Sequence, residues 1–91
     1  MTNYSTKVSS LTPSNVSALQ LAAEATGADT DGRVQLTATT ATYDGTATDA
    51  LGWLEHARSV LVRGGYGQNR HPVRSLAAVR RKLEAEVQAG H

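Results

Sequence analysis

The chain contains no cysteine and no phenylalanine, and its large rings are limited to Trp53 and three tyrosines. Without cysteine, a disulfide framework, a thiolate nucleophile and a cysteine-ligated zinc site are excluded. With so few large rings, the core of this 91-residue chain must be built mainly from aliphatic side chains. A chain of this length can form one modest domain in this way.

Long apolar runs are also missing. No stretch reaches the length of a transmembrane helix, and the opening residues MTNYSTKVSSL contain no apolar segment of signal-peptide length. Arginine outnumbers lysine seven to two, a bias typical of GC-rich bacterial genomes and their phages. We therefore expect a cytoplasmic protein of a bacterium or of a phage-infected cell.

Acidic residues are absent from one long segment. Between Glu55 and Glu84 the chain carries six arginines, one lysine and two histidines but no acid, whereas residues 1–48 carry four acids and two basic residues. The net charge is only +1, yet the chain is segregated by charge. Because unpaired cations displace the counterions of nucleic acids, we expect a nucleic acid as the partner, with an acidic protein surface as the alternative.

The first half of the chain predicts an arm, a helix and a strand. Residues 1–11 are polar and rich in Ser and Thr, which is typical of a flexible arm, and residues 12–91 form the single domain. Thr12 is a candidate N-cap, Pro13 suits the first helical position, and Gly27 ends the helix.

The segment RVQLTATTATY, residues 33–43, alternates in polarity and is rich in β-branched residues, which predicts one strand or a short hairpin. A single strand needs a partner. The sequence leaves three partners open: the N-terminal arm, the segment itself folded about Thr39–Thr40, or the same strand of a second copy.

A helical hairpin is predicted for the remainder, so the expected fold is α+β and mostly α. The first helix begins at Thr46 or Thr48 and ends at Gly64–Gly65, and the second runs from Pro72 to Gly90. The second helix has an apolar stripe of Val73, Leu76, Leu83 and Val87, with Val79 beside it. Arg58 and Arg80 project toward the apolar faces and are expected to extend along them or to pair with Glu84, with Glu86 or with an acid of a partner.

The loop RGGYGQNRHPVR, residues 63–74, joins the two helices of this hairpin. It lacks the final glycine of a dinucleotide-binding fingerprint, follows a helix instead of a strand, and lacks the Gly-Lys-Ser/Thr of a phosphate-binding loop, so both types of nucleotide site are excluded. Two compatible interpretations remain. The loop is a solvated connection, and it also brings Arg63, Arg70 and His71 beside a helix N-terminus, where phosphate can bind.

The candidate nucleic-acid-binding residues follow from this loop and the last helix. Arg74 and Arg81 fall on the solvent side of the helix, with Lys82 about a quarter-turn away. Tyr66 is available for base stacking and Asn69 for hydrogen bonds to base edges. The full set is Arg63, Tyr66, Asn69, Arg70, His71, Arg74, Arg81 and Lys82. The alternative is a basic face that is merely solvated.

A second function is compatible with the sequence: a protein–protein interaction module, such as a phage virion component or an inhibitor of a host protein. The Thr-rich segment TATTATYDGTATD, residues 37–49, would suit an edge strand that pairs with another chain. The strand at 33–43 would also allow a homodimer. The candidate interface residues are Val34, Leu36, Trp53 and Val60.

An enzyme is not expected. His56, His71 and His91 show no metal-ligand spacing, and Glu55 and His56 are adjacent, so on a helix they point about 100° apart. A helical domain this small seldom forms the enclosed pocket that catalysis needs. We therefore assign no catalytic residue, metal site or cofactor, and expect a regulatory or accessory protein.

Overall fold

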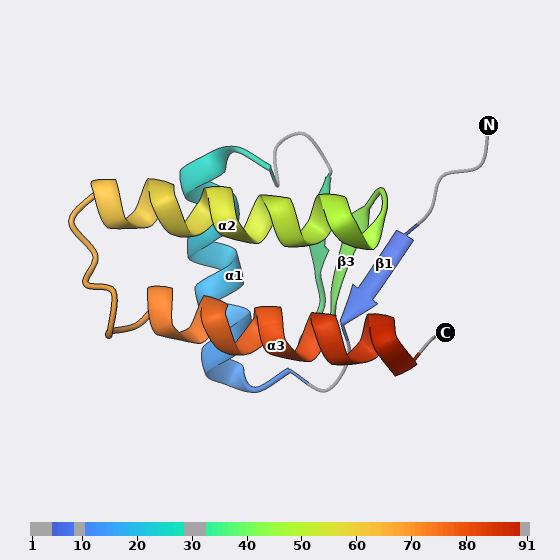
Figure 1. The fold of residues 1–91 in the computed structure, drawn as a ribbon. Coiled ribbons are helices and arrows are strands. Elements are labelled where there is room, and N and C mark those ends of the chain that lie inside the picture. The colour runs from blue at the N-terminus through green and yellow to red at the C-terminus, as the bar shows by residue number, and fades with distance from the viewer. Residues whose placement is uncertain (1–4, 9–10, 29–32, 90–91) are drawn as a thin grey trace.

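The computed structural model describes residues 5–8, 11–28 and 33–89, which form three strands and three helices (Figure 1). In chain order these are β1 (Ser5–Val8), α1 (Pro13–Thr26), β2 (Val34–Leu36), β3 (Ala41–Asp44), α2 (Ala47–Arg63) and α3 (Val73–Ala89). The predicted α+β, mostly helical fold, with a helix, a short hairpin and a C-terminal helical hairpin, is confirmed.

Helix α1 begins and ends at the predicted residues. The Asn15 N–H donates a hydrogen bond to Thr12 Oγ1 at 3.2 Å, and Pro13 occupies the first turn. At the other end Gly27 has a φ of 73°, a left-handed conformation that costs glycine little. These local signals set the two ends of the helix.

Strands β2 and β3 both come from the segment that was predicted as a strand or short hairpin. The Thr37 N–H donates to the Thr40 carbonyl at 2.8 Å, so the chain reverses here and pairs with itself in an antiparallel manner. The turn shifts the alternation of buried residues by one position. Core-facing residues are even-numbered before it (Val34, Leu36) and odd-numbered after it (Ala41, Tyr43).

Strand β1 lies in the stretch that the sequence assigned to a flexible arm, and here the structure differs from the sequence analysis. Ser5–Val8 pair antiparallel with β3, which gives the sheet order β1-β3-β2. Val8 lies opposite Ala41 and is fully buried. The sequence of β1, STKV, has one apolar residue, so it lacks the alternation of apolar and polar residues by which a strand is predicted. The rest of the predicted arm up to residue 10 lies outside the described residues.

The helices and the sheet pack in two layers. Figure 1 shows α2 and α3 running antiparallel in one layer, with α1 and the sheet side by side behind them. Buried side chains from each described helix and strand meet between the layers, the largest fully buried ones being Leu19, Leu76, Leu83, Val8 and Val34. This aliphatic core matches the shortage of large rings in the composition.

The helical hairpin also follows its local signals. A capping box starts α2: the Asp49 N–H donates to Thr46 Oγ1 at 3.1 Å, and the Thr46 N–H donates to Asp49 Oδ2 at 3.3 Å. In α3 the buried residues are Val73, Leu76, Val79 and Leu83, and Val87 is partly buried against the core. Val79, predicted beside the stripe, lies within it. The predicted end of α3 at Gly90 lies outside the described residues.

Candidate polyanion-binding surface

The loop between α2 and α3 forms the end of the hairpin farthest from the sheet (Figure 1). Helix α2 ends where the N–H groups of Gly64 and Gly65 donate to Val60 and Val62 carbonyls at 3.0 and 3.1 Å. The chain enters α3 when the Arg74 N–H donates to the Arg70 carbonyl at 3.0 Å. Residues 63–71 are all exposed. The loop is therefore both the solvated connection that the sequence predicted and an accessible surface.

An open cleft of about 560 Å³ lies where the start of α1 meets the start of α3. We call it the α1–α3 cleft; it is lined by Pro13, Ser14, Ser17, Asn69, His71, Arg74 and Ser75. His71 joins its two walls, because Nε2 lies 3.3 Å from Ser17 Oγ and Nδ1 lies 3.2 Å from Ser75 Oγ. The fold thus brings together three predicted site residues: Asn69, His71 and Arg74.

The three serines of the cleft were missed by sequence reasoning. Ser14 and Ser17 lie in the first turns of α1, more than fifty residues before Asn69 and His71, with which they line the cleft. Their hydroxyl groups both donate and accept hydrogen bonds. The only sequence signal for them was their place near a helix N-terminus. Their meeting with α3 depends on tertiary packing.

Two helix N-termini contribute positive potential to the cleft. Free N–H groups and the helix dipole make a helix start favourable for anions, unless an acidic side chain of the first turn already occupies it. Neither α1 nor α3 has an acidic residue in its first turn, whereas α2 has Asp49. The α1–α3 cleft therefore contains helix starts without acids, together with the Arg74 guanidinium.

The arginines of the acid-free segment divide into two groups. Arg80 pairs with Glu55 of α2 and lies 3.6 Å from Glu84, and Arg58 lies 3.8 Å from Glu55. The expected pairing of Arg58 and Arg80 with acids is confirmed: Glu84, one of the acids named, lies beside Arg80, and Glu55, which was not named, lies beside both arginines. The second group, which we call the exposed arginines, consists of Arg63, Arg70, Arg74 and Arg81. Within the described ranges none of these forms an ion pair with an acid.

The remaining predicted residues differ in availability. Tyr66 is the large apolar side chain most open to solvent in the described part of the chain, with 42% of its surface exposed. Asn69 is exposed as well. Lys82 is half-buried and takes part in an interaction within the molecule, so it is not counted among the free cations. The predicted nucleic-acid-binding residues therefore remain accessible except for Lys82.

The residues predicted to form a protein–protein interface agree less well with the structure than the predicted nucleic-acid-binding residues do. Val34 is only 1% exposed and belongs to the core, so its assignment to an interface is wrong: it lies on the inner face of β2. Leu36, Trp53 and Val60 are half-buried. Strand β3 is paired on both sides, so within the described residues the free strand edges belong to β1 and β2. In the Thr-rich segment, residues 37–49, the strand is the central β3, so the assignment of this segment to an edge strand is wrong.

The described residues contain neither a candidate metal site nor a candidate membrane-spanning helix. No three His, Asp or Glu side chains come close enough to hold a metal ion. No helix in that part of the chain is sufficiently long and apolar to cross a bilayer.

Comparison with known proteins gives no relative: a scan against protein-family models and searches of curated proteins and of solved structures found no match. The function is therefore inferred from the residues and their geometry.

Proposed function

We propose that this protein binds nucleic acid through the exposed arginines and the α1–α3 cleft, as a non-enzymatic regulatory or accessory factor. One observation carries the proposal: four guanidinium groups of an acid-free segment lie exposed without an acidic partner among the described residues, while two others are neutralised. Unpaired surface cations attract a polyanion by releasing its counterions.

The positions of the exposed arginines suit a phosphate backbone. Arg74 and Arg81 lie about two turns apart on α3, a span of roughly 10 Å at 1.5 Å per residue, and Arg70 lies in the loop just before this helix. Arg63 lies on the other side of the same loop. Guanidinium groups bind phosphate oxygens in a bidentate manner, so each can hold one phosphate. In this arrangement the cleft receives the phosphate that Arg74 binds.

The exposed ring of Tyr66 favours a single-stranded nucleic acid over a duplex as the ligand. It lies in the loop between Arg63 and Arg70, and its ring is exposed. Aromatic rings flanked by cations are typical of single-strand binding, in which bases stack on the ring while the cations hold the backbone. Asn69, in the same loop and at the cleft, can bond a base edge.

The compartment proposed for this activity is the cytoplasm of a bacterium or of a phage-infected cell. This proposal rests on the arginine-rich composition, which is typical of GC-rich bacterial genomes and their phages. In that compartment nucleic acid is available to a small accessory protein, and no catalytic residue or cofactor needs to be invoked.

A protein-interaction module is the rival proposal, either a phage virion component or an inhibitor with an acidic target surface. The half-buried Leu36, Trp53 and Val60 give it some apolar area, and the outer edge of β2 could pair with a second copy. It has less support than nucleic-acid binding because the central strand is already paired on both sides.

The test measures affinity for single-stranded and duplex DNA and RNA against salt concentration. The native chain is compared with the Arg63→Ala/Arg70→Ala/Arg74→Ala/Arg81→Ala variant. We expect the log–log salt dependence to flatten by about 0.7–0.9 for each phosphate that the variant no longer neutralises. Binding that is absent, or insensitive to salt, would instead support a protein partner.

A control variant separates local from general charge effects. Lys7→Ala/Arg58→Ala removes two cations that lie outside the proposed surface, on β1 and within the Glu55 ion pair. Arg74→Ala/Arg81→Ala removes the same total charge from the surface itself. If the two double variants lose affinity equally, binding depends on net charge and not on this surface.

A further inference from the structure

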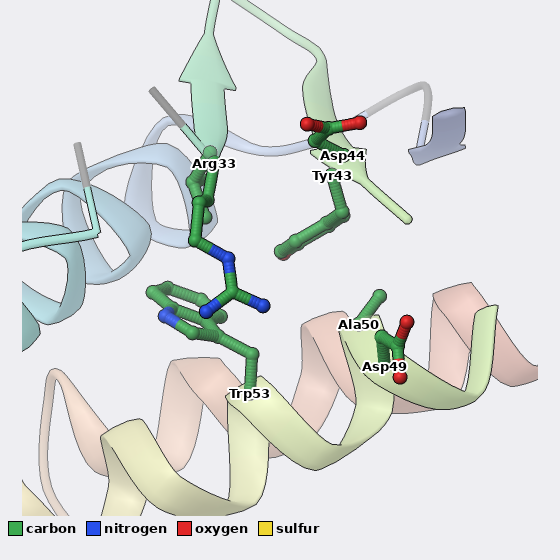
Figure 2. A pocket seen from close by; sticks show the side chains of 7 residues that line it. Arg33, Tyr43, Asp44, Asp49, Ala50 and Trp53 are labelled. Carbon is green, nitrogen blue, oxygen red and sulfur yellow. The ribbon is translucent and has the colours of Figure 1, made fainter. Parts of the chain in front are cut away.

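A second, small cavity lies away from the α1–α3 cleft, between the β2–β3 hairpin and α2 (Figure 2). Its volume is about 10 Å³, close to what one water molecule needs. Figure 2 shows the Arg33 side chain extending over the cavity toward the Trp53 ring, with Tyr43 reaching in from β3. Asp44 and Asp49 also line it.

Two hydrogen-bonding groups of the residues that line the cavity have no partner among the described residues. Tyr43 is 2% exposed, and neither its hydroxyl oxygen nor Trp53 Nε1 forms a hydrogen bond with a described residue. The rings lie beside one another, with centroids 5.6 Å apart and planes inclined at 56°. Buried polar groups are nearly always satisfied by protein or by ordered water. Two unsatisfied groups on residues that line the same cavity therefore indicate a missing partner.

The chemistry of the lining identifies that partner. The Trp53 indole only donates, and burial raises the pKa of Tyr43, so the phenol keeps its proton and can donate as well. Asp44 and Asp49 outweigh Arg33 by one negative charge, which disfavours an anion. A cation is disfavoured as well, because the Trp53 N–H and the Tyr43 O–H would point their hydrogens toward it. The site suits a small neutral group that accepts hydrogen bonds.

We propose that this cavity binds one water molecule, which accepts hydrogen bonds from Trp53 Nε1–H and the Tyr43 hydroxyl, and that the Arg33 side chain covers it. The site is independent of the nucleic-acid-binding surface. A buried water of this kind has about three hydrogen bonds and is exchanged slowly. It joins Tyr43 of β3 to Trp53 of α2.

The primary test is a crystal structure of the full chain at a resolution that shows ordered waters. We expect density for a single water about 3 Å from both Trp53 Nε1 and the Tyr43 oxygen. A cavity without density, or direct hydrogen bonds from both groups to protein atoms, would overturn the proposal.

Fluorescence gives a second readout, because Trp53 is the sole tryptophan. Tyr43→Phe keeps the ring but removes one donor, so we expect the water to be lost and the Trp53 emission to shift to shorter wavelength. Tyr66→Phe, in the exposed loop, is the matched control and should leave the emission unchanged. Equal emission in the native chain and Tyr43→Phe would contradict the bridging water.

The covering role of Arg33 is tested by hydrogen exchange at the Trp53 indole. Arg33→Ala should speed this exchange several-fold, whereas Arg58→Ala, which removes a half-buried arginine on α2 itself, should not. Equal rates in the native chain and Arg33→Ala would show that Arg33 does not cover the site.

Discussion

Glu55 of α2 pairs with Arg80 of α3, and this ion pair spans the two helices of the C-terminal hairpin. The same carboxylate lies near Arg58 on its own helix. One acid at the edge of the acid-free segment therefore neutralises arginines from both helices. The exposed arginines lie beyond its reach, and the proposed function depends on this division.

Removing the charge of Glu55 should strengthen nucleic-acid binding. Glu55→Gln releases Arg80 and Arg58 from their shared acid and removes a repelling charge, so affinity at low salt should rise by about 1 kcal/mol, roughly fivefold. Because the side chains of this pair are almost half exposed, unfolding free energy should fall by no more than about 1 kcal/mol. Titration with a fluorescent oligonucleotide and chemical denaturation measure the two effects.

Glu24→Gln is the matched control for that experiment. Glu24 is exposed on α1, and its replacement changes the net charge by the same amount. An equal gain in affinity for both variants would mean that only the total charge matters.

Tyr66 should contribute to binding without contributing to stability. Its ring is exposed, so Tyr66→Ala should leave the unfolding free energy within about 0.5 kcal/mol of the native value. The loss of base stacking should weaken single-strand binding by about 1–3 kcal/mol, while Tyr66→Phe should retain it. Binding that is unchanged in Tyr66→Ala would limit the interaction to phosphates.

An acid placed in the α1–α3 cleft should affect stability and binding in opposite directions. Ser14→Glu puts a carboxylate in the first turn of α1, where it stabilises the helix by about 0.3–1 kcal/mol. The same carboxylate repels a phosphate in the cleft, so affinity should fall by about fivefold at low salt. Gln20→Glu, exposed further along α1, adds the same charge outside the cleft. It should weaken binding much less.

The helices were predictable because their signals are local. The Thr12 N-cap, Pro13 and Gly27 act within a few residues of one another, as do Thr46 and Asp49. Strand β1 was not predictable, because its one buried apolar residue, Val8, becomes informative only once β3 lies beside it. The candidate polyanion-binding surface also has a part that was predictable from the sequence and a part that depends on tertiary contacts. The exposed arginines were visible in the sequence, but the contact of Ser17 with His71 joins residues 54 positions apart.

The role of β1 in the fold is itself testable. Val8→Ala removes two methyl groups from a fully buried position, so it should lower the unfolding free energy by about 2 kcal/mol. For a domain of this size that corresponds to a decrease in Tm of roughly 8–16 °C. Lys7→Ala, at the exposed neighbouring position, should change Tm little. Equal Tm values for native and Val8→Ala protein would show that residues 5–8 do not pack in solution.

The central claim is that four particular guanidinium groups are free to bind phosphate while two others are not. It is tested most directly by NMR of the Nε–Hε groups of the native chain during titration with a single-stranded oligonucleotide. The predicted result is that the signals of Arg63, Arg70, Arg74 and Arg81 shift with the bound fraction, while those of Arg58 and Arg80 stay in place. Shifts of equal size in all six, or shifts confined to Arg58 and Arg80, would contradict it.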